Sequence, residues 1–157
     1  MKNGRITVVL LILGMMLFGC SYNDAELSGS KPPNAMIEIN EDTYETTLGT
    51  YCWGAGDQGV CVDTAGPKEL VKDKETIKVN AGDMITIVMD YEPKPTETEL
   101  IQIDEEKEVK VDVLDNRFQA PNEKGVYYYS YGVWWLDDED PNVSNGDAFY
   151  AFVIEVK

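Results

Sequence analysis

From Ala35 onward, short apolar runs alternate with polar turns, and no stretch keeps the 3.6-residue spacing of an amphipathic helix. Runs rich in β-branched and aromatic residues between turn residues are typical of strands. Regularly spaced short strands without intervening helices predict an all-β sandwich. We expect strands at residues 35–39, 44–53, 60–63, 76–79, 84–91, 100–103, 109–114, 126–135 and 148–156.

Three connections carry local signals of their own. The stretch Asn80–Asp83 reads NAGD and predicts a turn between two strands. Residues 67–72, PKELVK, can form one short helical turn, because proline is tolerated at the first helical position. Residues 92–97, EPKPTE, predict a loop, since proline cannot donate to a strand ladder.

The N-terminus has a different pattern. Lys2 and Arg5 precede an uncharged, largely apolar run over residues 6–18. This run is too short to cross a bilayer, which takes about 20 helical residues. A basic start, a short apolar run and a small residue at its end are typical of a cleaved signal peptide. We expect the signal peptide to cover residues 1–19.

The end of this run, Leu17-Phe18-Gly19-Cys20, resembles the lipobox of bacterial lipoproteins. Leu17 and Gly19 stand at matching positions, whereas Phe18 replaces the usual small or β-branched residue. The resemblance implies that Cys20 becomes the lipidated first residue, attached to the extracytoplasmic face of the cell membrane by several acyl chains. An ordinary signal peptide cut nearby and an uncleaved anchor are the alternatives. Residues 20–34, which are polar and contain Gly, Ser and Pro, predict a flexible tether to a domain at 35–157.

The net charge of the chain is −16, and without residues 1–19 it has 11 basic and 29 acidic residues, a net of −18. An anionic surface of this kind repels nucleic acid and anionic headgroups, and it suits cationic partners and divalent cations. No basic patch with interleaved aromatic residues occurs. We therefore expect no nucleic-acid partner.

Cys52 and Cys61 flank a glycine-rich turn. In a hairpin with Cys52 opposite Cys61 and a four-residue loop at 55–58, the two Cα atoms would lie about 4.5 Å apart, within reach of a disulfide. A metal site would need carboxylates as its other ligands, because the chain has no histidine. A thioredoxin-type redox pair has a shorter spacing. In an exported protein this pair predicts a disulfide.

The C-terminal third reads EKGVYYYSYGVWW, then a polar loop, then NGDAFYAFVIEV. This pattern resembles the last two strands of an immunoglobulin-like domain. Residues 35–157 are similar to uncharacterised Ig-like lipoproteins of Gram-positive bacteria, on the cysteine hairpin, the Ala81-Gly82-Asp83 turn and the aromatic strand. The resemblance implies an immunoglobulin-like antiparallel β-sandwich of seven to nine strands; that family has no assigned activity, so the resemblance adds almost nothing on function.

The aromatic strand is apolar on both faces, yet only one face of a sandwich strand packs inward. We therefore expect some of its rings at the surface, where Tyr and Trp favour binding sites for a cell-wall glycan, a peptide or a protein. Loops covering the second face are the alternative. The candidate binding residues are Tyr128, Tyr129, Tyr131, Trp134 and Trp135.

The loop before the last strand concentrates oxygen ligands of the kind that calcium prefers. Its spacing does not match an EF-hand, and a solvated acidic loop is the simpler interpretation. No other metal and no cofactor is expected. The weak calcium candidates are Asp137, Asp138, Asp140, Asn142 and Asp147.

Catalysis has little support in the sequence. Without histidine there is no usual neutral-pH general base and no Ser-His-Asp arrangement, and no serine lies in a nucleophile-elbow motif. The sequence therefore favours a membrane-anchored, non-catalytic binding module at the cell envelope. A calcium-stabilised structural or adhesive module and a small carboxylate-dependent hydrolase are the alternatives.

Overall fold

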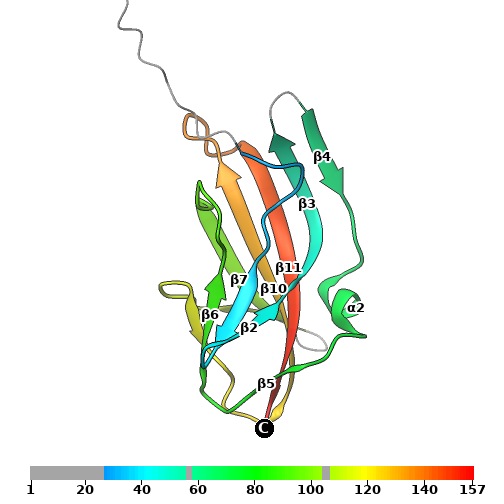
Figure 1. Ribbon diagram of the computed structural model, residues 1–157, viewed down its shortest axis with the longest axis vertical. Coiled ribbons are helices and arrows are strands. Elements are labelled where there is room, and N and C mark those ends of the chain that lie inside the picture. The colour runs from blue at the N-terminus through cyan, green and yellow to red at the C-terminus, as the bar shows by residue number, and fades with distance from the viewer. Residues whose placement is uncertain (1–26, 56–57, 104–106) are drawn as a thin grey trace, which may run out of the picture.

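The computed structural model describes residues 27–55, 58–103 and 107–157, and it confirms the all-β sandwich (Figure 1). The signal peptide and Cys20 lie outside the described residues. The smaller sheet has the order β2 (Asp42–Glu45), β1 (Met36–Ile39), β6 (Met84–Val88), β9 (Arg117–Gln119). The larger sheet has the order β4 (Gln58–Val62), β3 (Thr47–Ala55), β11 (Ser144–Val156), β10 (Gly125–Leu136), β7 (Glu97–Ile103), β8 (Glu108–Val111), with β5 (Ile77–Val79) parallel to β11.

The strand order is that of an immunoglobulin-like sandwich. Strands β1, β6 and β9 are neighbours in one sheet, and β7, β10 and β11 are neighbours in the other. These correspond to the A-B-E and C-F-G neighbours of the immunoglobulin fold. The hairpin β3–β4 is added beside β11. The described part of the chain holds eleven strands, two more than the nine that we expected.

The two additional strands have local explanations. The expected strand at 44–53 is divided at Thr46, because β2 pairs with β1 in the smaller sheet and β3 pairs with β11 in the larger one. Thr46 stabilises this crossing, since its backbone N and its hydroxyl both donate to the Ala35 carbonyl. Strand β9 has only three residues, and a buried Phe118 fixes it to the core. The predicted helical turn is α2 (Pro67–Val71), with Pro67 in its first turn.

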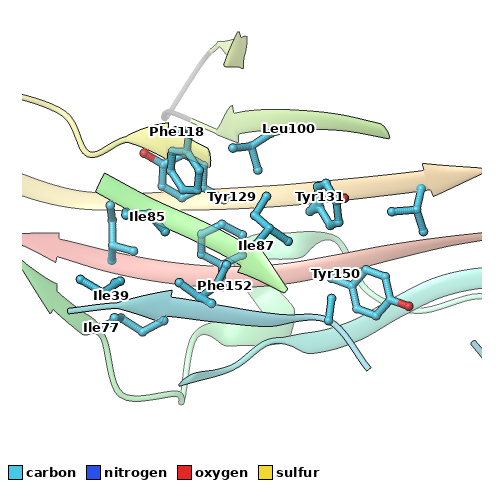
Figure 2. Close-up of a cluster of buried hydrophobic side chains, with 14 of the residues drawn as sticks. Ile39, Ile77, Ile85, Ile87, Leu100, Phe118, Tyr129, Tyr131, Tyr150 and Phe152 are labelled. Atoms are coloured by element: carbon cyan, nitrogen blue, oxygen red, sulfur yellow. The ribbon is translucent and has the colours of Figure 1, made fainter. Parts of the chain in front are cut away.

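The core fills the space between the sheets (Figure 2). Isoleucines of β1 and β6 meet aromatic rings of β10 and β11, and Tyr129 stacks on Phe152 with 5.0 Å between ring centroids. Each buried tyrosine hydroxyl needs a partner, because an unpaired buried hydroxyl is costly. Tyr129 donates to Gln102 Oε1, and Tyr150 donates to the Pro33 carbonyl at 2.5 Å.

The N-terminal segment that we expected to be a tether is partly integrated into the domain. Leu27, Pro32 and Ala35 are buried, so the packed domain includes Leu27 and does not begin at Ala35. The cause is apolar contact with the end of the sandwich, which outweighs the polar composition of residues 27–34. Within the described ranges, no helix is long and apolar enough to span a membrane.

Candidate ligand-binding site on the outer face

Alternation along β10 decides which of the predicted binding residues reach the surface. Tyr129, Tyr131 and Trp135 are at most 4% exposed and face the core, so their assignment to a binding surface was wrong. They point inward because the smaller sheet packs on that face. Tyr128 and Trp134 lie on the opposite, outer face and are half-buried.

The helix α2 covers one part of this outer face. Leu70 and Val71 pack against Ala151 and Val153 of β11 and against Tyr128 of β10. The Nζ atom of Lys68 lies 5.4 Å from the centroid of the Tyr128 ring. Tyr128 is therefore packed against α2. The part of the outer face near Trp134 is the part that stays accessible to a ligand.

A β-bulge shapes the neighbouring region. Tyr51 pairs with Ala148 and Leu48 pairs with Tyr150, so the two residues Gly49 and Thr50 oppose the single residue Phe149. Bulges of this kind re-aim side chains and often lie beside binding sites. Gly49 leaves little room for a side chain in the floor of the site, because an added Cβ would lie 3.1 Å from Leu70 Cδ1 and 3.2 Å from the Phe149 carbonyl oxygen.

Above the bulge lies a hollow of about 300 Å³, the lower end of the usual size for small-ligand sites. Its hydroxyl groups come from Thr50, Thr64 and Ser130; the Thr50 and Thr64 oxygens are 3.3 Å apart, and the Thr64 backbone N donates to the Thr50 hydroxyl. Among the described residues that line it, none is Asp, Glu, Lys or Arg. The lining is Gly49, Thr50, Thr64, Ala65, Gly66, Pro67, Leu70, Ser130, Phe149, Tyr150 and Ala151.

Phe149, which lines the hollow, belongs to an aromatic pair on the outer face. Trp134 and Phe149 pack edge to face with centroids 5.4 Å apart. A Cβ at Gly132 would lie 2.6 Å from Trp134 Cη2 and 3.0 Å from Phe149 Cε1, so the glycine leaves room for both rings over β10. None of the predicted binding residues lines the hollow itself: Trp134 contacts the lining residue Phe149, and Tyr128 packs against the cluster that includes Ala151.

Sequence reasoning missed most of this site, including Phe149, Thr50, Thr64 and Leu70. One signal was available: Ser130 is a small residue on the same face as Tyr128 and Trp134, and it lines the hollow, whereas the space over Gly132 is filled by Trp134 and Phe149. The bulge, and the loop that brings Thr64 beside Thr50, depend on contacts between distant segments.

The predicted disulfide is confirmed. Cys52 and Cys61 are bonded, with their Cα atoms 4.1 Å apart, and the expected register is present. Pairing extends one step further than expected, to Ala55 opposite Gln58. On the outer face Asp147 lies between Cys52 and Trp134 and accepts from the Cys52 backbone N at 3.3 Å. Partial burial raises the pKa of Asp147, and this hydrogen bond partly opposes the rise.

The acidic loop is organised by its own hydrogen bonds. Asp137 Oδ1 accepts from the backbone N of Glu139 and of Asp140, and Asp140 Oδ1 accepts from the backbone and the side chain of Asn142. These bonds lower the pKa of Asp137 and of Asp140. Asp138 is exposed. Over the described ranges, no group of three or more His, Cys, Asp or Glu residues is arranged to hold a metal ion. Calcium binding stays a prediction.

Comparison with protein-family models, with curated proteins and with solved structures finds no match to the chain.

Proposed function

We propose that the protein is a lipoprotein anchored through Cys20 to the extracytoplasmic face of the cell membrane, and that it binds a neutral glycan of the cell envelope in the outer-face hollow. The observation that carries the binding proposal is the lining of the hollow. Aromatic and aliphatic groups and three hydroxyls surround about 300 Å³, without a charged side chain among the described lining residues.

The chemistry of that lining suits a sugar ring. A pyranose offers an apolar C–H face to Phe149, against which Trp134 packs, and hydroxyls to Thr50, Thr64 and Ser130, whose side chains can both donate and accept. A charged ligand would lose its hydration without gaining a partner in such a site. In a chain with a net charge of −16, the proposal therefore favours a neutral ligand over a polyanion.

The proposed activity is binding without catalysis. Glycoside hydrolysis ordinarily takes two carboxylic groups on either side of the scissile bond. Strand pairing places Asp147 and Glu97 on the two sides of Trp134. Asp147 is already hydrogen-bonded to the Cys52 backbone, and neither carboxylate is among the described residues that line the hollow.

Binding can be tested by filling the hollow from its exposed rim. Ala65→Trp places a large ring at the hollow, and Ala81→Trp is a matched control, because Ala81 is equally exposed but lies on the turn before β6. With tri-N-acetylchitotriose as the neutral probe, calorimetry should show a Kd of about 1 mM or tighter. Ala65→Trp and Trp134→Ala should weaken it about tenfold or more, and Ala81→Trp should not.

Two results would contradict the glycan proposal. One is the absence of heat with the trisaccharide; the other is an affinity that Ala65→Trp leaves unchanged. If a neutral alanine-rich peptide binds instead, and Ala65→Trp abolishes that binding, the hollow is a peptide site and the glycan assignment is wrong.

The anchor is tested separately. In a bacterial host, Cys20→Ala should move the protein from the membrane to the soluble fraction, and mass spectrometry should find acyl groups on the mature N-terminus of the parent protein. Ser21→Ala is the control and should stay membrane-bound. An unmodified cysteine on a membrane-free product would refute the anchor and leave the binding proposal intact.

A further inference from the structure

An aromatic cluster closes one end of the sandwich. Trp53, Tyr91 and Trp135 pack edge to face, with ring centroids 4.9 to 5.7 Å apart. Leu27 is buried at the same end: a Cβ added at Gly146 would lie 2.6 Å from Leu27 Cδ1 and 2.9 Å from Trp53. The first described residue is thus part of the packed domain.

Hydrogen bonds fix the backbone that follows Leu27. Trp53 Nε1 donates to the Gly29 carbonyl at 3.1 Å. The Tyr91 hydroxyl accepts from the Ser28 backbone N at 2.7 Å and donates to the Ser28 carbonyl at 3.1 Å. The side chains of Trp53 and Tyr91 thereby hold the backbone of residues 28–29 in place. We call these contacts the N-terminal clamp.

The clamp lies at the end of the sandwich that is opposite to the C-terminus. The blue N-terminal segment begins beside the orange loop that joins β10 to β11, and the C-terminus lies at the other end of the long axis (Figure 1). Strand pairing agrees, because Trp53 pairs with Gly146 near the start of β11, whereas Val156 at its end pairs with Gly125.

We propose that the clamped end faces the membrane and that the clamp holds the domain upright, close to the bilayer. The inference rests on the proposed lipidation of Cys20. From Cys20 to Leu27 there are seven residues, which span at most about 25 Å when fully extended. A tether that reached Ala35 would be about twice as long, and it would let the domain turn freely.

Charge limits contact between the protein and an anionic bilayer. The membrane-facing end carries the acidic loop, including Asp137, Asp138 and Asp140, and the chain as a whole is strongly anionic. Anionic headgroups repel this end as well as the flanks of the sandwich, so in this proposal the short tether, and not charge, keeps the clamped end near the membrane. Phe149 is three residues beyond Gly146 on β11, about 10 Å along the strand. The hollow therefore opens sideways, within about 35 Å of the membrane surface.

The orientation can be measured by energy transfer in vesicles. A donor dye is placed at Asn142 in the acidic loop, or at Asn122 in the exposed loop before β10, on the full lipidated protein. The acceptor is a headgroup-labelled lipid in phosphatidylethanolamine–phosphatidylglycerol vesicles. The two sites lie at opposite ends of β10, whose twelve residues extend about 36 Å. We expect strong transfer from Asn142 and at least threefold weaker transfer from Asn122.

A clamp variant makes the test specific. Leu27→Ser with Tyr91→Phe removes the buried side chain and both bonds to Ser28, and it should bring the two transfer efficiencies together. Tyr127→Phe is the matched control, because its hydroxyl donates to the Glu123 carbonyl near the other end; it should leave the difference unchanged.

The outcomes separate this inference from the proposed function. Equal transfer from Asn142 and Asn122, with acyl groups present on Cys20, overturns the orientation and leaves the anchor standing. A difference that survives the clamp variant overturns the role of the clamp. An unacylated Cys20 overturns the anchor and the orientation together, whereas binding in the hollow is unaffected by all three results.

Discussion

The two faces of β10 have similar composition and different roles. On the inner face, Tyr129, Tyr131, Val133 and Trp135 are at most 4% exposed, and the rings belong to the core (Figure 2). On the outer face, Tyr128 and Trp134 are separated by Ser130 and Gly132, and they are half-buried. The inner face is filled continuously, whereas Ser130 on the outer face lines a hollow.

The difference shows that aromatic content alone does not identify a binding surface. The polar atoms of the inner rings are hydrogen-bonded within the fold: Trp135 Nε1 donates to the Pro93 carbonyl at 2.7 Å, and the Tyr129 hydroxyl donates to Gln102. Burial raises the pKa of Tyr129 and of Tyr131 above the ordinary value of 10.0, at which a phenol is already neutral at physiological pH. The outer ring of Trp134 instead lies over Gly132 and packs against Phe149, which lines the uncharged hollow.

The largest expected effect comes from comparing two adjacent tryptophans. Trp135→Ala removes a ring from the Trp53–Tyr91–Trp135 cluster and should lower the free energy of unfolding by about 3–5 kcal/mol. Trp134→Ala, on the outer face, should lower it by about 1 kcal/mol. Urea denaturation of both variants measures the difference. Equal losses would show that the two faces of β10 are packed alike.

The second effect concerns the disulfide of the β3–β4 hairpin, beside the outer face. Replacing both Cys52 and Cys61 by Ala should lower the free energy of unfolding by about 2–3 kcal/mol, mainly through the greater freedom of the unfolded chain. Wild-type protein treated with reductant should lose a similar amount. Retained stability in both samples would mean that the hairpin is held by the sheet alone.

Much of the fold was accessible from the sequence where the determining contacts are local. The hairpin register follows from the two-residue period of a strand and a nine-residue separation, so pairing Cys52 with Cys61 was predicted correctly. The helical turn at Pro67 and the turn at Gly82, which has a φ of +74°, also carry their signals in adjacent residues. These features do not depend on what packs against them.

The remainder depended on contacts between distant segments. Both faces of β10 are apolar, so alternation could not decide which face the smaller sheet would cover. The crossing at Thr46 depends on the Ala35 carbonyl, and the hollow requires the Gly49–Thr50 bulge opposite Phe149. The burial of Leu27 depends on Trp53 and Gly146, which are far away in the chain.

The smallest predicted effect concerns the charge of Asp147 on the outer face of the sheet. Asp147 is half-buried between Cys52 and Trp134, and burial raises its pKa above the ordinary 3.8. The native state therefore binds the proton more tightly than the unfolded state. The contribution of this carboxyl to the free energy of unfolding is therefore greatest below pH 3.8, and it falls as the pH rises through the raised pKa. Above that pKa the ionised carboxylate destabilises the fold.

Asp147→Asn keeps an oxygen acceptor for the Cys52 backbone N and removes the charge. We expect it to be more stable than the wild type at pH 7, by less than about 1 kcal/mol, and equal to it below pH 3.8. Thermal unfolding across this range measures the difference. Asp137→Asn is the control of opposite sign: hydrogen bonds lower the pKa of Asp137, so its stabilisation is present above 3.8 and is lost as the pH falls through the lowered value. If Asp147→Asn is instead less stable than the wild type at pH 7, the ionised carboxylate stabilises the outer face and the prediction is wrong. The outer face would then accommodate a charge next to a hollow that has no charged residue in its described lining.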